Sequence, residues 1–428
     1  MQNILVIGYV WPEPRSSAAG SRMMELLELF RAQGWQVTFA SAAALSPHRA
    51  DLAALDIAEI QVALNCDSFD QWVNELQPDM VLFDRFFTEE QFAWRVERAC
   101  PTALRVLDTS DLHSLREARQ QLLKTAQNAC ANETEKQQVG AVTAHADQLF
   151  SVMAASDTAK REVAAIFRSD LTLMISEFEM QLLQQAFAVP AALLHHCALM
   201  LIPGAIEPAA FAERAHFISI GNFRHAPNWD AVLWLKHALW PLVRQRLPQA
   251  QLHVYGAYPP PKATALHNPK QGFHVLGWAD DAHQVMSQAR VCLAPLRFGA
   301  GIKGKLADAM ACGTPSVTTA MGSEGMHGHM PWGGAIVDSA TAFADAAVAL
   351  HEDQSLWLQA QAHGHAILQQ RFDRPRLGRE LITRLQQLSD NLAAHRQDNF
   401  IGQMLRHHSL KSTQYMSQWI AAKNKIAD

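Results

Sequence analysis

The chain has 428 residues, a length that suggests two or three domains, and 49% of the residues are hydrophobic and 18% charged. This balance is typical of a globular enzyme and argues against a disordered or fibrous protein. The net charge of −5 argues against a general nucleic-acid-binding protein, and no apolar run approaches the roughly 18 residues that span a bilayer.

Cysteine and histidine spacing gives no sign of a metal site. The six cysteines are scattered without a CxxC pair, which predicts reduced thiols in a cytoplasmic protein. The histidine pairs His195-His196 and His407-His408 are adjacent in sequence, so their side chains would not share one face of a helix or strand. Residues 1–10 lack a basic region and are interpreted as a strand, not as a signal peptide.

The first half of the chain alternates predicted strands with predicted helices. Short apolar runs that predict strands lie at residues 3–10, 36–42, 79–83, 104–108, 171–175 and 198–202. An amphipathic pattern predicts a helix over residues 18–33, ending at Gly34, and the polar stretch 111–143 predicts helices over one face. This alternation predicts an α/β domain with a mostly parallel, doubly wound sheet.

A second α/β series begins near residue 208. Strands are predicted at residues 216–220, 251–255, 274–276, 291–296 and 316–319, and helices at 228–247, 281–289 and 304–312. We expect domains at residues 1–205 and 206–375, joined by a short hinge at 203–208, with a ligand cleft between them. Residues 376–428 are expected to form a helical C-terminal extension.

Residues 295–326 form the most informative segment, because a glycine-rich loop with two lysines lies between a predicted strand and a predicted helix. Gly299 and Gly301 permit close approach of the backbone to a ligand, and the helix dipole favours an anion at the loop. Lys303 and Lys305 add positive charge, so the segment predicts a diphosphate site. An ordinary strand–helix turn is the alternative interpretation.

The sequence PLRFGAGIKGKLADAMACGTPSVTT, together with ISEFEMQLL, IPGAIE and FISIGNFRHAPNWDAVLWL, resembles glycosyltransferases of the GT-B fold. The resemblance covers roughly residues 1–375 and is most specific in the second half. It is to the retaining branch called glycosyl transferases group 1, or family four. It implies two Rossmann-like domains that face a central cleft, with the nucleotide sugar bound by the C-terminal domain and the acceptor mainly by the N-terminal domain.

The resemblance assigns expected roles to residues of the C-terminal domain. Gly221, Asn222 and Phe223 would lie beside the donor phosphates, and residues 299–305 would wrap the diphosphate. Asp308 would contact the ribose. Here Ala300 and Asp308 replace the two glutamates common in the family, which bears on recognition of the donor sugar. No metal or other cofactor is expected beyond the nucleotide sugar.

Several polar residues of the N-terminal domain follow predicted strands. Asp108, Asp111 and His113 are candidate catalytic residues, because the carboxyl ends of parallel strands form the usual ligand edge. Gly20 and Arg22 are candidates for contact with phosphate or acceptor, with an ordinary loop as the alternative. Asp84-Arg85 is a weaker candidate, and Ser176, Glu177 and Glu179 are interpreted as a helix cap and acidic first turn.

We expect transfer of a sugar, of the hexosyl type, from a nucleotide-diphosphate sugar to a hydroxyl group of a glycan, lipid-linked glycan or protein. Alternatives are a sugar-nucleotide 2-epimerase and a non-catalytic nucleotide-sugar-binding or assembly protein. No nucleic-acid partner is expected. The basic, helical segment from residue 389 is either a solvated tail or a docking surface for an anionic membrane or a protein, so the expected location is cytoplasmic, free or peripheral on the inner face of the membrane.

Overall fold

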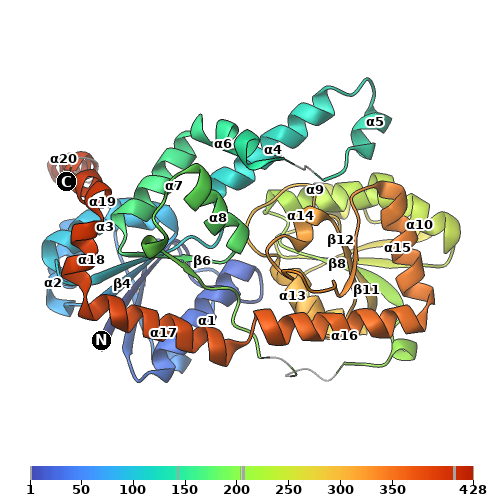
Figure 1. The fold of residues 1–428 in the computed structure, drawn as a ribbon, viewed down its shortest axis with the longest axis horizontal. Helices are drawn as coiled ribbons and strands as arrows, with labels where there is room; N and C mark the ends of the chain where they lie inside the picture. Colours follow the sequence, from blue (N-terminus) through green and yellow to red (C-terminus); the bar gives the residue numbers. More distant parts are fainter. Residues whose placement is uncertain (1, 142–143, 203, 205–207, 408–410, 428) are drawn as a thin grey trace.

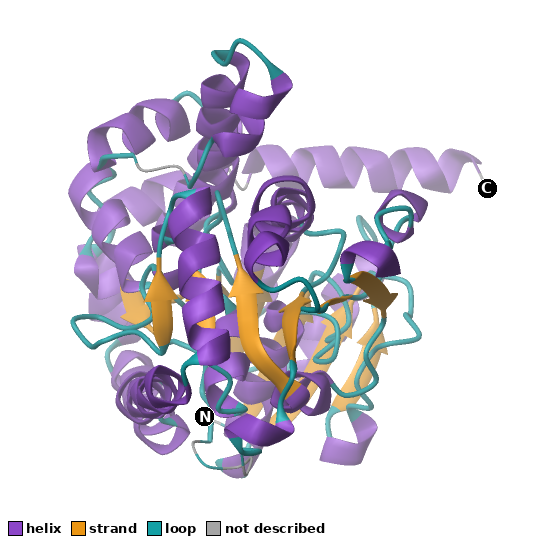
Figure 2. Ribbon diagram, turned by 90° about the vertical axis from the view of Figure 1, so that its right-hand side faces the viewer, coloured by secondary structure: helices purple, strands orange, loops and turns teal. Residues whose placement is uncertain are grey.

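The computed structural model describes residues 2–141, 144–202, 204, 208–407 and 411–427. Two lobes lie side by side, and each is built on a parallel sheet covered by helices (Figure 1). In the perpendicular view, strands occupy the middle of the molecule and helices lie on both sides of them (Figure 2). The GT-B arrangement of two Rossmann-like domains predicted from the sequence is therefore confirmed.

The N-terminal sheet has seven parallel strands. Its spatial order is β3 (Ala58–Gln61), β2 (Gln36–Ser41), β1 (Asn3–Gly8), β4 (Met80–Asp84), β5 (Leu104–Asp108), β6 (Leu171–Met174) and β7 (Leu194–His196). Every residue of β4 and β5 is buried, as expected for central strands covered on both faces.

The C-terminal sheet has six parallel strands. Its spatial order is β10 (Phe273–Gly277), β9 (Leu252–Tyr255), β8 (His216–Ile220), β11 (Ala289–Ala294), β12 (Ser316–Thr318) and β13 (Gly334–Ile336). In both sheets the order reverses beside the first strand, and loops at the carboxyl ends of such strands form the usual ligand crevice.

The helices of the N-terminal lobe connect successive strands or cover the sheet. They are α1 (Ala18–Ala32), α2 (Asp67–Leu76), α3 (Arg85–Ala99), α4 (His113–Asn128), α5 (Glu133–Gln138), α6 (Ala146–Ala154), α7 (Asp157–Arg168) and α8 (Glu177–Ala186). The helices of the C-terminal lobe are α9 (Ala226–Trp234), α10 (Trp240–Arg246), α11 (Pro261–Thr264), α12 (Ala282–Gln288), α13 (Gly304–Ala311), α14 (Ala320–Ser323), α15 (Ala340–Glu352) and α16 (Gln354–Arg371).

Helices α4 and α5 form an arm that extends from the first lobe over the second (Figure 1). The indole N–H of Trp234 donates to the carbonyl of Gln137 at 2.8 Å, and the Arg297 guanidinium donates to the carbonyl of Val139 at 3.1 Å. The helices expected over residues 111–143 are therefore present, although residues 142 and 143 lie outside the described part. Besides covering a face, they tie the lobes together.

The C-terminal helices return to the first lobe. Helix α17 (Arg374–Asp390) follows α16 along one side of the molecule (Figure 1), and its buried face includes Leu377, Leu381 and Leu385. These leucines belong to one hydrophobic core with residues of α1 and α13. The remaining helices are α18 (Leu392–Asp398), α19 (Phe400–Leu405) and α20 (Lys411–Ala427). No helix in the described ranges has the length and apolar character of a membrane span.

Most predicted elements agree with the structure to within two residues, but several predictions are wrong. Residues 198–202 form no strand, since the last strand of the first sheet is β7, a few residues earlier. The expected helix over 228–247 begins at Ala226 and contains a π-helical turn at Leu235–Leu239. The short edge strands β3 and β13 were not predicted.

The predicted hinge at 203–208 lies mostly outside the described residues, which there include only Gly204 and Pro208. The exact domain limits at 205 and 375 stay a prediction. The C-terminal extension is helical as expected.

Candidate functional site between the lobes

A cavity of about 640 Å³ lies between the two lobes. Its walls are formed where the chain leaves the carboxyl ends of strands in both sheets: Tyr9 after β1, Arg85 after β4, Ser110 after β5, Gly221 after β8 and Leu296 after β11. This is the edge at which parallel α/β sheets bind ligands. A smaller cavity of about 200 Å³ adjoins it and shares some of the same lining residues.

The C-terminal wall carries a lysine held in place by an asparagine. The Lys305 ammonium group donates to Asn228 Oδ1 at 2.8 Å, and Asn228 Nδ2 donates to the carbonyl of Asn222 at 3.0 Å. A Cβ atom at Gly221 would lie 2.6 Å from Lys305 Nζ, so only glycine leaves room for this arrangement. Burial, together with the nearby charge of Lys303, lowers the pKa of Lys305 to about 8, so a negative charge placed beside the ammonium group would favour its protonated form.

Lys303 lies on the same loop but bends back onto it. Its ammonium group donates to the carbonyls of Ala300 at 3.2 Å and Gly301 at 2.6 Å, which stabilises the turn. Burial lowers its pKa to about 8, while the nearby Glu324 carboxylate opposes that shift. Lys303 therefore shapes the loop and adds charge to the cavity, and Lys305 is the lysine whose ammonium group Asn228 orients.

Two helix N-termini meet at the cavity. Helix α1 begins after Ser17, whose hydroxyl accepts from the Gly20 N–H, and helix α13 begins at Gly304. A Cβ at Gly304 would lie 2.7 Å from the Cβ of Ala18, so the two ends approach closely. Both helix dipoles present their positive ends to the same space, which favours a multiply charged anion.

The opposite wall carries a charged triad of Asp111, His113 and Arg116. The Arg116 guanidinium pairs with the Asp111 carboxylate, and His113 Nε2 lies 3.5 Å from Asp111 Oδ1. Burial alone would raise the pKa of Asp111, but Arg116, His113 and His225 lower it to about 2. Burial lowers the pKa of His113 to about 4, so its imidazole is neutral at pH 7 and can exchange hydrogen bonds with a sugar hydroxyl.

Two non-glycine residues that line the larger cavity have left-handed backbone conformations. Arg85, directly after β4, has φ 70°, and Ser110, shortly after β5, has φ 58°. Such conformations are costly for residues with a Cβ and concentrate at functional sites. Both residues line the cavity, which supports the functional interpretation of the Asp84-Arg85 turn.

The structure places most of the candidate residues on the cavity wall. These are Asp111, His113, Arg22, Gly221, Asn222, Gly299, Lys303, Lys305 and Asp308. Gly20 lines the adjoining smaller cavity, where a Cβ would lie 2.3 Å from the carbonyl oxygen of Glu13. Its place is therefore fixed by close packing of α1 on the preceding loop.

Asp108, Phe223 and Gly301 are not among the residues that line either cavity. Asp108 is buried and paired with Arg22 at 2.8 Å, and Arg22 also donates to the carbonyl of Cys197. Phe223 is 5% exposed and belongs to the core of the C-terminal lobe. The Arg22–Asp108 pair thus joins α1 to β5 beneath the site, which limits what either side chain can offer a ligand.

Asp308 and Ala300 occupy the positions at which the resemblance implies glutamates. Asp308 lines the cavity, and its Oδ1 lies 3.3 Å from His283 Nε2. The hydrogen bond to Asp308 raises the pKa of His283. Ala300 is a buried lining residue without a polar side chain, so the carboxylates at this end of the cavity differ from the family pattern.

Two residues near the site, Asn228 and Glu179, make contacts that the sequence did not reveal. Asn228, interpreted as a possible cap, orients Lys305, and the helix it belongs to has His225 at its N-cap. Glu179, interpreted as part of an acidic helix turn, accepts from the N–H groups of Gly301 at 2.7 Å and Leu112 at 3.2 Å. Ser176 does start α8 but makes no capping bond through its side chain.

Arg119 of the arm was not singled out at all. It donates to the carbonyl of Gly299 at 2.9 Å and forms a two-bond pair with Glu324, at 2.9 and 2.7 Å. Arg119 and Glu179 therefore fix the glycine loop from the opposite lobe. Among the described residues, no group of three or more histidine, cysteine, aspartate or glutamate side chains is arranged to hold a metal ion.

Comparison with known proteins agrees with this architecture. Residues 214–353 match the family model of the glycosyl transferases group 1. Sucrose-phosphate synthase from Thermosynechococcus elongatus superposes with a TM-score of 0.63 at 16% identity, covering 91% of this chain and 99% of that one. Anabaena HepE, solved in complex with UDP and glucose, superposes with a TM-score of 0.64 at 15% identity, covering 91% of this chain and 100% of that one.

A third similar structure is Staphylococcus aureus TarM, solved with Fondaparinux, alpha-GlcNAc-glycerol and UDP. It gives a TM-score of 0.55 at 11% identity, covering 74% of this chain and 57% of that one. At these identities the likeness establishes the fold. No curated protein sequence matches the chain.

Proposed function

We propose that this chain, a GT-B-fold glycosyltransferase with a group 1 domain, transfers a hexosyl group from a nucleoside-diphosphate sugar to a hydroxyl acceptor. The observation that carries the proposal is the convergence of Lys305, the glycine loop and two helix N-termini, one from each lobe, at one part of the cavity. A diphosphate has the charge and oxygen atoms that these groups would bind.

In the proposed mechanism, the acceptor oxygen forms a bond to the anomeric carbon while the bond from that carbon to the diphosphate oxygen breaks. The departing diphosphate oxygen takes the proton of the acceptor hydroxyl. Lys305 and the N-terminus of α13 stabilise the negative charge that develops on the leaving group. These groups supply the charge compensation, so we propose a reaction that needs no metal ion. Activity is accordingly expected to persist in excess EDTA.

The opposite wall would position the sugar. His113 is neutral at pH 7, and the ionised Asp111 lies beside its ring, so His113 can donate to a sugar hydroxyl while Asp111 holds the ring. Asp111 is itself paired with Arg116, which makes it a poor nucleophile. The resemblance to the retaining branch implies retention of configuration, so with no suitable nucleophile we propose that the acceptor attacks from the same face as the departing phosphate.

The similar proteins suggest which donor to test, and the smaller cavity suggests where the acceptor would enter. UDP and glucose bind the similar protein HepE, so UDP-glucose is the first donor to test. The acceptor would enter beside the smaller cavity, which Glu13, Arg85 and Tyr258 line. A glycan, a lipid-linked glycan or a protein can each present the required hydroxyl.

The direct test is the thermal shift of the protein with UDP-, GDP-, dTDP- and CMP-sugars, followed by donor turnover. A true donor raises the apparent melting temperature because it binds only the folded state. Lys305→Ala is expected to lower kcat/KM for that donor by about 100-fold, whereas Lys270→Ala, on the exposed surface, leaves it unchanged. Unchanged turnover and donor affinity in Lys305→Ala would reject the diphosphate assignment.

A further inference from the structure

Helix α20 reverses the burial pattern of an ordinary surface helix, because it buries a polar residue and exposes its large apolar ones. Its buried position is a small polar residue, Ser417, which is 4% exposed and whose hydroxyl bonds Arg95 at 2.9 Å and Asn65 at 2.8 Å. Its largest described apolar side chains point outward: Tyr415 is 64%, Met416 59% and Trp419 60% exposed. Surface helices normally bury such residues, so this face calls for a partner.

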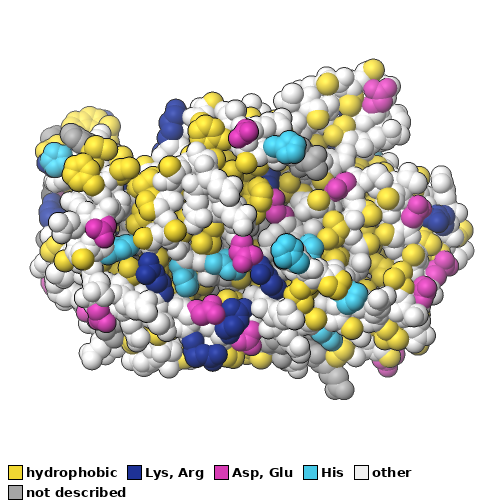
Figure 3. Space-filling view, in the orientation of Figure 1, with side chains coloured by type: hydrophobic (Ala, Val, Ile, Leu, Met, Phe, Trp, Pro, Cys, Tyr) yellow, Lys and Arg dark blue, Asp and Glu magenta, His cyan; other side chains and the backbone are white. Residues whose placement is uncertain are grey.

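The preceding helix continues the same pattern. Phe400, Ile401 and Met404 of α19 are also largely exposed. No other stretch of about twenty residues in the described ranges exposes as many large hydrophobic side chains. Figure 3 shows hydrophobic atoms gathered over this end of the molecule, at the place that α19 and α20 occupy in Figure 1.

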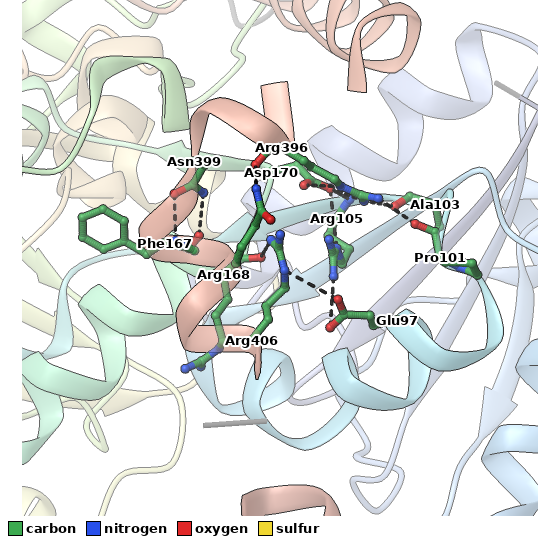
Figure 4. Close-up of polar contacts among 12 residues, drawn as sticks. Glu97, Pro101, Ala103, Arg105, Phe167, Arg168, Asp170, Arg396, Asn399 and Arg406 are labelled. Carbon is green, nitrogen blue, oxygen red and sulfur yellow. Dashed lines mark hydrogen bonds and ion pairs between the residues drawn. The ribbon is translucent and has the colours of Figure 1, made fainter. Parts of the chain in front are cut away.

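These helices are held firmly against the N-terminal lobe. Arg396 bonds both carboxylate oxygens of Asp170, at 2.8 and 2.7 Å, and donates to the carbonyls of Pro101 and Ala103 (Figure 4). Asn399 donates to the carbonyl of Phe167 at 2.8 Å, as Figure 4 also shows. The exposed apolar residues are therefore carried on an ordered support.

Arg406 adds a second buried anchor. It is 9% exposed, donates to the carbonyl of Arg168 at 3.2 Å and lies 3.6 Å from Glu97 (Figure 4). Burial lowers its pKa to about 10. The Arg406 side chain thus anchors the segment to the N-terminal lobe and does not contribute charge to its outer face. That outer face is apolar with basic ends.

The charge on the outer face of α19 and α20 favours an anionic partner. Residues 399–427 contain no aspartate or glutamate, although the whole chain has a net charge of −5. Lys411 and Lys423 are exposed toward the two ends of α20, and Lys423 Nζ lies 5.4 Å from the Trp419 ring centre. Exposed tryptophan and tyrosine flanked by lysine is the composition of helices that lie in the headgroup region of a bilayer.

We propose that the outer face of α20, with the exposed residues of α19, docks the protein on an anionic lipid surface. The aromatic side chains would enter the interface, and the lysines would contact lipid phosphates. A second copy of the same face is a poor occupant, because pairing two such faces would bring lysines of equal charge together. Docking would set the N-terminal lobe on the bilayer, which, on the proposed function, favours a lipid-linked acceptor.

The test is flotation of the full-length protein with vesicles, in the absence of any donor or acceptor. Vesicles of phosphatidylcholine with about 30 mol% phosphatidylglycerol should bind the protein at least about tenfold more strongly than pure phosphatidylcholine. Met416→Ser/Trp419→Ser should weaken this binding about tenfold or more, and Lys411→Gln/Lys423→Gln should remove most of the preference for anionic lipid.

The matched control is Leu356→Ser/Leu358→Ser, which removes two exposed apolar side chains of α16 and should leave vesicle binding unchanged. Circular dichroism and the thermal shift with the donor verify that each variant is folded. Absence of wild-type binding to anionic vesicles would overturn the proposal, as would a wild-type dimer in light scattering that Met416→Ser/Trp419→Ser converts to a monomer. Because binding is measured without substrates, failure of the proposed activity would leave this result standing.

Discussion

At the residue scale, the protonation of two lysines makes the charge of the cavity depend on pH. Burial lowers the pKa of Lys305 and Lys303 to about 8, so in the free protein both lose their charge as the pH rises through that value. A bound diphosphate would raise both pKa values, because an adjacent negative charge favours the ammonium form. Affinity for a diphosphate is therefore fully present below pH 8 and declines above it.

We predict that UDP binding weakens by up to about tenfold per lysine for each pH unit above 8, until the pKa of the complex is reached. Isothermal titration calorimetry between pH 7 and 9.5 checks this, and buffers of different ionisation enthalpy should reveal proton uptake on binding above pH 8. Lys305→Arg keeps its charge across this range, so it should show a flatter profile. A wild-type profile that stays level to pH 9.5 would contradict the assignment.

Asp111 gives a second prediction at this scale. Asp111→Asn preserves the shape but removes the charge that pairs Arg116 and holds His113. We expect kcat to fall about 100-fold with little change in donor affinity, because the diphosphate would bind on the opposite wall. Steady-state kinetics and UDP titration separate the two effects. Asp157→Asn, at a side chain that is 91% exposed, serves as the control and should be neutral.

At the scale of elements, the loop between β11 and α13 is fixed by contacts that leave room only for glycine. Gly301 has φ 63°, and a Cβ there would lie 2.9 Å from the Cβ of Asp111. The loop of one lobe therefore touches the wall of the other lobe that carries Asp111, through a residue without a side chain. Any larger residue would have to move the loop or the wall.

We predict that Gly301→Ala raises the donor KM about tenfold or more and also lowers the melting temperature. The matched control is Gly34→Ala, because Gly34 has φ 75° but nothing within 4 Å of the new Cβ. Both substitutions impose a similar backbone strain of about 1 kcal/mol, and only the first adds a clash at the site. Equal kinetic effects in the two variants would show that the contact with Asp111 has no role.

The contrast between local and distant contacts explains how much the sequence could predict. Strands β5 and β8 and the start of α13 follow from apolar runs and glycine punctuation within a few residues, and they were predicted to the residue. The contact of Glu179 with Gly301 joins positions 122 residues apart, and that of Arg119 with Glu324 spans 205. No local pattern encodes such pairs, because they exist only after the lobes meet.

The same reasoning explains why some candidate site residues have surroundings that the sequence did not predict. Arg22 and Asp108 are both candidates for contact with a ligand, but they lie 86 residues apart in sequence and pair with one another. Arg22 still lines the cavity, whereas Asp108 does not. Phe223 follows a strand as expected, yet its apolar ring turns into the core. Edge strands such as β13, with only three residues, are too short to give a clear alternation.

At the scale of the whole molecule, two buried polar contacts join the lobes at the glycine loop. Glu179 of α8 bridges the N–H groups of Gly301 and Leu112, and burial, with Asp111 nearby, raises its pKa to about 7. Arg119 of α4 grips the carbonyl of Gly299 and the carboxylate of Glu324. Both act on the loop proposed to bind the diphosphate, so we expect lobe arrangement and donor binding to be coupled.

We predict that Arg119→Gln loosens this arrangement. The substitution removes both bonds to Glu324 and leaves that carboxylate, whose side chain is only 18% exposed, without its main partner. The lobes should separate more often, so small-angle scattering should give a larger radius of gyration without ligand. Because UDP would then have to close the lobes as well as bind, its affinity should fall about tenfold, and saturating UDP should restore the compact radius of gyration.

The control is Arg161→Gln, which breaks the exposed Arg161–Glu90 pair within the N-terminal lobe and tests whether loss of any arginine pair has this effect. If Arg119→Gln and the wild type scatter alike and bind UDP equally, the pair stabilises the arm alone and donor binding proceeds without a change in lobe arrangement.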